Sequence, residues 1–192
     1  SGATGAAVVT NNTVTSVYFT DGGSGYTTSP TITLSDAGSG TGATVTYNGE
    51  DKKSGGNSNV RYMTRKVTLA DGFDSGDLRV YVTAYKPSNS NILVYYKLLS
   101  TSDAETFDNK NWQLMTELGN ANFVSTNYED YRELTFAPGV NGSANNSVSY
   151  TSGSTAYNSF RTFAIKIVMS GSSTVDVPKV RDFRAIIGRA HV

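Results

Sequence analysis

The sequence of 192 residues contains no cysteine and a single histidine. The absence of cysteine excludes disulfide bonds, thiolate metal sites and cysteine nucleophiles. The single histidine, His191, lies one residue from the C-terminus, where it can supply neither a Ser-His-Asp triad nor a multi-histidine metal site. The side chains on which most hydrolytic and redox chemistry depends are therefore missing. We expect no enzyme activity, no cofactor and no metal centre.

An excess of charge of one sign and long apolar runs are missing as well. Sixteen Lys and Arg residues balance sixteen Asp and Glu residues, so no net field attracts the whole molecule to nucleic acid or to an anionic membrane. No run approaches the ~18 consecutive apolar residues of a membrane-spanning helix, and the first residues lack the pattern of a signal peptide. We expect neither nucleic acid nor a membrane as a partner. The sequence begins without Met, which suggests a trimmed portion of a longer protein.

Alternation of apolar and polar residues is the clearest pattern that is present. Apolar residues occupy every second position from Leu78 to Ala84 and from Ile92 to Leu98, which is the period of a half-buried strand. The turn-forming residues 87–91 between the two runs predict a hairpin. The full set of predicted strands in this part of the chain is 60–70, 77–86, 91–100, 112–117, 131–137, 160–169 and 179–188.

Seven predicted strands joined by loops rich in Gly, Asn and Ser indicate an antiparallel β-sandwich or jelly-roll-like domain over residues 60–192. Residues 102–111 and 140–159 are predicted to be long loops. One face of the strands is expected to form the core, with the following buried residues: Val67, Leu69, Leu78, Val80, Val82, Ile92, Val94, Phe163, Ile165 and Ile167.

Residues 1–48 form a separate Gly, Ser and Thr-rich module with strand-like runs at 14–20, 31–35 and 43–47. Residues 49–59 are polar and predict a linker to the larger domain. The chain is thus expected to be all-β throughout. A three-stranded module of this size buries too little apolar surface to be stable alone. We expect it to associate with the larger domain, with a copy of itself or with a neighbouring protein.

Three groups of carboxylates deserve comparison with known sites. Asp71, Asp74 and Asp77 are three residues apart and offer oxygen ligands for calcium, but a turn capped by aspartates is favoured because the closing Glu of a calcium loop is missing. The other two groups, around 103–108 and 129–133, each lie within one loop. Glycosidase carboxylates project from separate elements across a cleft, so these groups are interpreted as solvated surface.

The C-terminal strand is predicted to be basic, with Lys179, Arg181, Arg184 and Arg189. Regular alternation places Arg181 on the same face as Phe183 and Ile187.

Aromatic side chains suggest a possible binding site for a carbohydrate. A carbohydrate-binding module would present a stacking platform of aromatic rings, and the candidates for contact with a ligand or partner are Tyr81, Tyr85, Tyr95 and Trp112.

Segments 61–115 and 163–186, which include "VPKVRD", resemble virion structural proteins of contractile-tailed bacteriophages, particularly those of marine cyanobacteria. Residues 14–47 are similar to a Gly-Tyr-Ser/Thr-Pro module of phage tail and baseplate proteins. The resemblance implies a non-enzymatic structural or adhesive component of the virion, in a tail, baseplate, neck or fibre. It implies other virion subunits as partners and a homo-oligomer, with a trimer as the typical case. The alternative is recognition of a host surface glycan.

Overall fold

The computed structural model describes residues 4–10, 13–21, 49–56, 58–119, 123–140, 143–144 and 146–188. The chain divides into two compact units, Ser1–Asn57 and Ser58–Val192. In the first unit, β1 (Thr4–Thr10) pairs antiparallel with β2 (Thr13–Asp21). The strand predicted at 14–20 corresponds to β2, whereas no strand was expected at β1. The strands predicted at 31–35 and 43–47 lie outside the described residues.

Residues 49–56, at the start of the predicted linker, are folded into turns. The amide of Lys52 donates to the carbonyl of Gly49 at 3.2 Å, and the amide of Gly55 donates to the carbonyl of Lys52 at 2.8 Å. Gly56 has a φ of 81°, and a Cβ at this position would lie 2.5 Å from the Glu50 side chain. Only glycine satisfies both constraints, because other residues are strained at positive φ.

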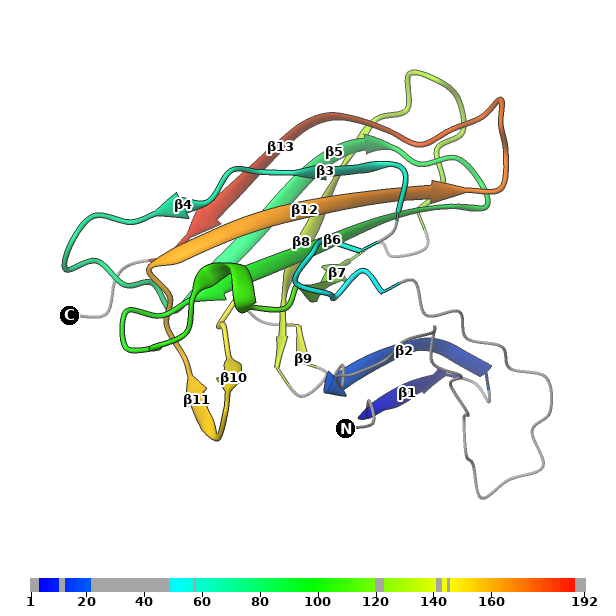
Figure 1. The fold of residues 1–192 in the computed structure, drawn as a ribbon. Coiled ribbons are helices and arrows are strands. Elements are labelled where there is room, and N and C mark those ends of the chain that lie inside the picture. Colours follow the sequence, from blue (N-terminus) through cyan, green and yellow to red (C-terminus); the bar gives the residue numbers. More distant parts are fainter. Residues whose placement is uncertain are drawn as a thin grey trace. The chain divides into compact units, whose positions relative to one another are not determined.

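The second unit is built around one antiparallel sheet of nine strands (Figure 1). The strand order is β13-β5-β8-β7-β6-β12-β3, with β4 also paired to β12 and β9 to β8. The bounds of the strands are β3 (Arg61–Met63), β4 (Val67–Thr68), β5 (Leu78–Tyr85), β6 (Ser90–Leu99), β7 (Gln113–Leu118), β8 (Arg132–Val140), β9 (Ser143–Ala144), β12 (Thr162–Gly171) and β13 (Lys179–Ile187).

Strand β7 turns this sheet into a sandwich, because it pairs with a different layer at each end. Its first residues pair with β6, at Gln113 and Leu114, and its last four residues pair with β8. The sheet therefore curls at β7, and the apolar faces of β5 and β8 face those of β6 and β12 across one core. The structure confirms the predicted all-β class and the β-sandwich-like domain. In the described part of the chain, no helix is long and apolar enough to cross a membrane.

The prediction that residues 78–85 and 92–99 form a hairpin is wrong. β5 pairs with β13 and β8, and β6 pairs with β12 and β7, so the two strands lie in different layers. The connection between them crosses from one layer to the other, with Asn89 at a φ of 57° and the Ser90 hydroxyl donating to the Pro87 carbonyl at 2.6 Å. Both strands carry one apolar face, and facing each other across the core buries both faces at once.

The predicted core is confirmed at the eight positions on β5, β6 and β12, whose residues are 0 to 8% exposed. The two predicted residues on the preceding segment differ. Val67 is 42% exposed, and Leu69 is only partly buried. Val67 pairs with Phe163 at the outer edge of β12, so it faces inward, and no strand among the described residues covers its other side. Position at an edge, which alternation does not reveal, accounts for the error.

The predicted loop 140–159 contains three short strands. β9 continues the main sheet beside β8, while β10 (Tyr150–Ser152) and β11 (Thr155–Tyr157) form a separate hairpin. The rings of Tyr150 and Tyr157 stack at 5.2 Å between centroids. The second predicted loop, 102–111, contains a short 3-10 turn at Phe107–Asn109. Strands of two or three residues are too short to show a period in the sequence.

Replacement of Val80 or Ile165 by Ala should destabilise the sandwich domain by about 2 to 4 kcal/mol, because the lost side-chain atoms leave a cavity between the layers. Both residues are at most 1% exposed. Urea unfolding measures the change. The matched control is Val175→Ala, since Val175 is 83% exposed and its truncation should leave the midpoint unchanged. Equal midpoints for Val80→Ala and Val175→Ala would contradict the assignment of the core face.

Candidate functional site

The structure separates the four aromatic residues predicted to contact a ligand or partner. Tyr85, Tyr95 and Trp112 are 4, 8 and 6% exposed, and Tyr81 is half-buried beside the Arg184 guanidinium. Tyr95 and Trp112 come together in one cluster, whereas Tyr81 and Tyr85 lie on β5 in the other layer. A sugar that stacks on a ring needs that ring exposed. Three of the four rings are covered by other side chains in this structure.

Tyr95 and Trp112 belong to a second apolar cluster, on the outer face of the β6–β12 layer. Phe107, from the 3-10 turn, completes its aromatic part. Two lysines lie against these rings. The Lys166 ammonium lies 4.3 Å from the centroid of Tyr95 and 5.3 Å from that of Trp112, and the Lys97 ammonium lies 5.1 Å from Trp112.

Both lysines of this aromatic–lysine cluster are buried, with Lys166 at 0% and Lys97 at 4% exposure. Their positions follow from the strands, because Lys166 lies opposite Tyr95 and Lys97 lies opposite Ala164 in the β6–β12 ladder. A cation over an aromatic face gains more when it is shielded from water. The cluster therefore compensates part of the cost of burying the charges, and its role is structural.

A network of hydrogen bonds around Asp103 holds loop 102–111 to the β10–β11 hairpin. The Lys110 ammonium forms an ion pair with the Asp103 carboxylate at 2.6 Å, and the Tyr150 hydroxyl donates to the same carboxylate at 2.9 Å. The Tyr150 hydroxyl also accepts the amide of Ser100 at 2.8 Å, and Lys110 donates to the Ser152 hydroxyl at 2.7 Å. Asp103 is 8% exposed, so its interpretation as solvated surface was wrong.

Burial of the Asp103 carboxyl tends to raise its pKa, because the charged form loses water. Hydrogen bonds from Lys110, from the Glu105 amide and from Tyr150 act in the opposite direction and outweigh burial. The net result is a pKa below the usual value, so Asp103 is ionised at neutral pH. This ionised, fully bonded carboxylate anchors the loop and is not positioned as a general acid.

The remaining carboxylates are dispersed. Asp71 pairs with the Arg161 guanidinium, Asp74 accepts the Thr101 hydroxyl at 2.8 Å, and Asp77 accepts the Ser147 hydroxyl at 3.3 Å. In the described ranges, no group of three or more His, Cys, Asp or Glu residues could hold a metal ion. Asp71, Asp74 and Asp77 thus contact side chains of three different segments, and not the backbone amides that the interpretation as an aspartate-capped turn predicted.

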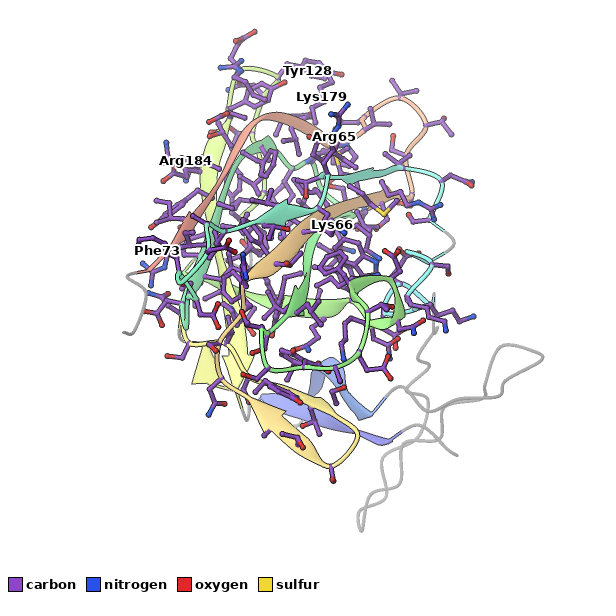
Figure 2. The ribbon with its side chains drawn as sticks, turned by 60° about the vertical axis from the view of Figure 1, so that its left-hand side comes forward. Arg65, Lys66, Phe73, Tyr128, Lys179 and Arg184 are labelled. Carbon is purple, nitrogen blue, oxygen red and sulfur yellow. The ribbon has the colours of Figure 1, made fainter. Side chains whose placement is uncertain are left out.

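The outer face of the β13–β5–β8 layer combines tyrosines with basic side chains. The Tyr85 hydroxyl donates to Asp176, and this hydrogen bond, together with burial, raises the pKa of Tyr85 to about 12. Tyr128 packs on Tyr85 at 5.6 Å between centroids and is itself 58% exposed. The Lys179 ammonium lies 5.2 Å from the Tyr128 centroid, and Figure 2 shows both residues at the same end of the domain. This surface, called the tyrosine face below, is accessible at Tyr128.

Arg181 belongs to the tyrosine face, and this corrects its predicted side. A β-bulge between Val180 and Asp182 interrupts the alternation of β13. The Arg181 guanidinium lies 3.9 Å from the Tyr131 centroid, while Phe183 and Ile187 pack against the core. A bulge adds one residue to a strand and so moves a side chain to the other face.

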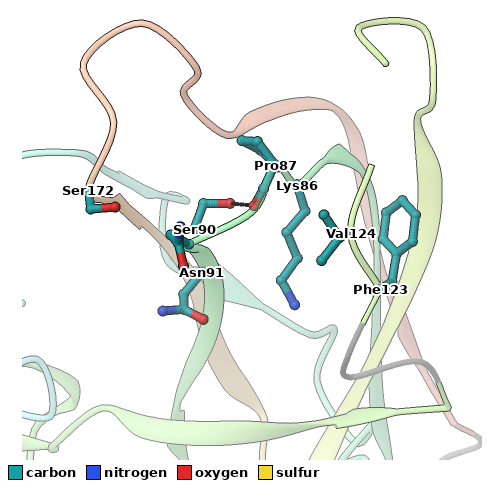
Figure 3. A pocket seen from close by; sticks show the side chains of 8 residues that line it. Lys86, Pro87, Ser90, Asn91, Phe123, Val124 and Ser172 are labelled. Carbon is teal, nitrogen blue, oxygen red and sulfur yellow. Dashed lines mark hydrogen bonds between the residues drawn. The ribbon is translucent and has the colours of Figure 1, made fainter. Parts of the chain in front are cut away.

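An open pocket of about 570 Å³ lies beside the segment that connects β5 to β6 (Figure 3). Lys86, Pro87, Asn91 and Phe123 are among its lining residues, and Figure 3 shows the Lys86 side chain between this segment and Phe123. The Lys86 ammonium lies 3.8 Å from the Glu117 carboxylate, whose pKa is raised by burial and partly lowered again by Lys86. The lining thus combines the Lys86 ammonium with small polar side chains and the Phe123 ring.

Five of the exposed large apolar side chains in the described part of the chain lie on residues 60–73, which we call the edge segment. It contains β3 and β4 and forms the outer edge of the β6–β12 layer. Figure 2 labels three members of this segment, with Arg65 above Lys66 near the centre of the view and Phe73 at its left. The large apolar residues of the segment that are 42 to 57% exposed are Val60, Tyr62, Met63, Val67 and Phe73.

Sequence reasoning missed the edge segment because it treated residues 60–70 as an ordinary half-buried strand. The string "VRYMTRKVT" contains a signal that could have revealed the edge, namely three cations in six residues between apolar ones. Charged residues on a strand favour an edge position. Such a surface, apolar and accessible, is typical of a contact site for another protein.

Comparisons of the chain with models of protein families, with curated proteins and with solved structures found no match.

Replacement of Asp103 by Asn should destabilise the domain by about 1.5 to 3 kcal/mol at neutral pH, since charge-assisted hydrogen bonds to Lys110 and Tyr150 are lost. The pKa of Asp103 is lowered in the folded state, so its contribution is present above the unfolded pKa of about 3.8 and is lost as the pH falls through the folded value. Urea unfolding at a series of pH values measures both effects.

The difference in the free energy of unfolding between wild type and Asp103→Asn should therefore be constant near neutral pH and should become smaller below about pH 4. Asp108→Asn is the matched control, because Asp108 lies in the same loop and is exposed. A difference that stays constant down to pH 2, or an equal loss in Asp108→Asn, would rule out the proposed role of the Asp103 carboxylate.

Proposed function

We propose that the chain is a non-enzymatic structural or adhesive component of a bacteriophage tail or baseplate, where it acts through contacts with other virion subunits. The observation that carries this proposal is the exposed apolar edge segment, whose five large side chains are 42 to 57% exposed. Apolar surface of this extent is costly to leave in water and is suited to burial against another protein. The sequence resemblance of segments 61–115 and 163–186 supports the location in a virion.

The proposed contacts include copies of the same chain. Residues 1–48 are a small, glycine-rich module that gains stability from any surface that covers its strands. A homo-oligomer, with a trimer as the form typical of tail appendages, would provide such cover. Sedimentation of the full chain above monomer mass is the expected result, and a strictly monomeric chain at high concentration would exclude this part of the proposal.

The location in the virion is tested on particles from the source of the sequence. Mass spectrometry of purified particles should find the chain in a fixed ratio to the tail proteins, because a structural subunit has a defined copy number. Antibodies against residues 58–192 should label one end of the particle in electron micrographs. Antibodies against a capsid protein are the control for label elsewhere. Absence of the chain from purified particles would contradict the proposal.

Binding of a host surface glycan is the second candidate function, and the tyrosine face favours it. Tyr128 is 58% exposed beside Lys179, and the Tyr131 ring stacks with Arg181. Exposed aromatic rings with adjacent cations are suited to stacking against a sugar and to binding its charged groups. This site differs from the predicted platform, because the rings of Tyr85, Tyr95 and Trp112 are covered.

A glycan array tests the second candidate. If the tyrosine face binds a glycan, Tyr128→Ala should weaken the affinity about two- to tenfold, since loss of a stacked ring costs roughly 0.5 to 1.5 kcal/mol. Tyr62→Ala is the matched control, because Tyr62 is 51% exposed but lies on the edge segment. An array without binding, or equal loss in both variants, would reject the tyrosine face as a glycan site.

A further inference from the structure

One side of the β-sandwich is closed by a strand and the opposite side is open. β7 joins the two layers by pairing with β6 and with β8. At the other side, the sheet ends at β13 in one layer and at β3 and β4 in the other, and within the described residues no strand pairs with either outer edge. The rings of Tyr62 and Phe183 touch across this side, 5.6 Å apart and edge to face.

The side chains that face inward at the open side are incompletely covered. Tyr62 lies opposite Ile167, and Val67 lies opposite Phe163, so both share the core face of β12. Tyr62 and Val67 are nevertheless 51 and 42% exposed. An additional strand along this edge would cover them in the way that β6 covers the other side of β12.

The backbone of β3 has unused hydrogen-bonding groups at this edge. The amide of Thr64 donates to the carbonyl of Ile165 at 2.9 Å, and the carbonyl of Val60 accepts the amide of Met169 at 3.1 Å. Backbone groups alternate in direction along an antiparallel strand. Val60 and Thr64, which are four residues apart, both direct backbone groups toward β12. Met63 is next to Thr64 and has the opposite direction, so its N–H and C=O point away from β12 to the open side.

Both edges of the open side are basic. Residues 60–68 and 179–187 together contain six Lys or Arg residues and one acidic residue, Asp182, although the charges of the whole chain balance at sixteen of each sign. Glu133 on β8 pairs with Arg184 and offsets one of the six. In the view of Figure 2, Lys179 lies directly above Arg65, Lys66 lies below them and Arg184 lies to the left. The local excess of positive charge favours an acidic partner.

The same charges argue against a second copy of the chain as the occupant. In an antiparallel pair of two β3 strands centred on Met63, Arg61 of one copy would lie opposite Arg65 of the other. Like charges directly opposite each other destabilise a pair of strands. Cations on edge strands prevent pairing between identical molecules, but they do not prevent pairing with a strand of opposite charge.

We propose that the open side of the sandwich, between β3–β4 and β13, accepts an extended acidic strand of a different subunit, which pairs with the backbone of β3 at Met63. The strand carries carboxylates that meet Arg65 and its neighbours, alternating with apolar residues that cover Tyr62 and Val67. This mode of recognition takes its affinity from main-chain hydrogen bonds and its specificity from alternate side chains. The inference rests on the proposed function of the chain as a subunit that works through protein contacts.

The probe is a fluorescent, capped octapeptide in which Glu alternates with Val and Thr, and its control is the same peptide with Lys in place of Glu. Fluorescence anisotropy with the full chain should show that the Glu peptide binds at least about tenfold more tightly than the Lys peptide, and that added salt weakens this binding. Amide exchange should show protection of Met63 on binding, with no change at Gly153 in the β10–β11 turn. No binding of the Glu peptide, or binding without protection of Met63, would overturn the proposal.

Two substitutions at the same position separate backbone pairing from side-chain contact. Met63→Pro removes the N–H that points away from β12 and leaves the ladder with β12 intact, whereas Met63→Ala keeps that N–H. We expect Met63→Ala to bind the Glu peptide and Met63→Pro to lose at least about tenfold in affinity. Equal binding by the two variants would overturn pairing with β3.

A third variant, Arg65→Glu, keeps the proposal testable if Met63→Pro does not fold. It alters only an exposed side chain and should shift the preference from the Glu peptide toward the Lys peptide. An unchanged preference would overturn the role of the basic edge. If particles lack the chain but the Glu peptide binds as described, the virion assignment fails and the strand site stands. If particles contain the chain but the peptide does not bind, the strand site fails alone.

Discussion

The apolar faces of β5 and β8 in one layer and of β6 and β12 in the other are buried against each other. Each of β5, β6 and β12 carries large apolar residues at every second position on its inner face. Val80, Val94 and Ile165 are at most 1% exposed as a result. Each such side chain contributes about 1.5 to 3 kcal/mol when it is removed from water. This mutual burial places β5 and β6 in opposite layers and makes β7 pair with both layers. This arrangement of the layers also determines where the outer faces of the β6–β12 layer and of the β13–β5–β8 layer lie.

The outer face of β12 is covered as well, which is unusual for a strand of a sandwich with one solvated face. Loop 102–111 supplies this cover, and the loop is held by the bonds between Asp103, Lys110 and Tyr150. Lys166 is fully buried beneath it. A buried ammonium is costly unless it has favourable contacts, and the rings of Tyr95 and Trp112 provide them. The Asp103 network thus stabilises the environment of a lysine on another element.

The sequence was sufficient to predict what depends on the period of a strand. It identified the six long strands of the second unit, with boundaries within a few residues, and the buried rows from Leu78 to Val82 and from Phe163 to Ile167. At 60–70 it predicted one strand, where the structure has the two short strands β3 and β4. It did not reveal which strands pair, because alternation shows that a face is buried but not which strand covers it. The predicted hairpin between β5 and β6 failed for this reason. The bulge at Arg181 could not be seen either, because one extra residue changes the face without changing the composition.

The candidate sites were less predictable, since exposure depends on distant segments. Trp112 and Tyr95 look the same in sequence whether a loop covers them or not, and so do the carboxylates of Asp103 and Asp108. The exposed apolar residues on the edge segment were not predicted, because apolar residues in a strand were assumed to be buried. Only the position of β3 and β4 at the end of the strand order changes that assumption.

The ladder between the edge segment and β12 is interrupted between β3 and β4. The Thr64 hydroxyl accepts the amide of Ile165 at 3.0 Å in place of a backbone carbonyl, so the ladder with β12 breaks at Arg65 and Lys66. A barrel would remove both edges by pairing β3–β4 with β13. Pairing of those two strands would bring their six basic side chains together with a single aspartate, and repulsion opposes it. The charges that keep this sandwich from closing on itself leave β3, Tyr62 and Val67 accessible to a strand that carries the opposite charge.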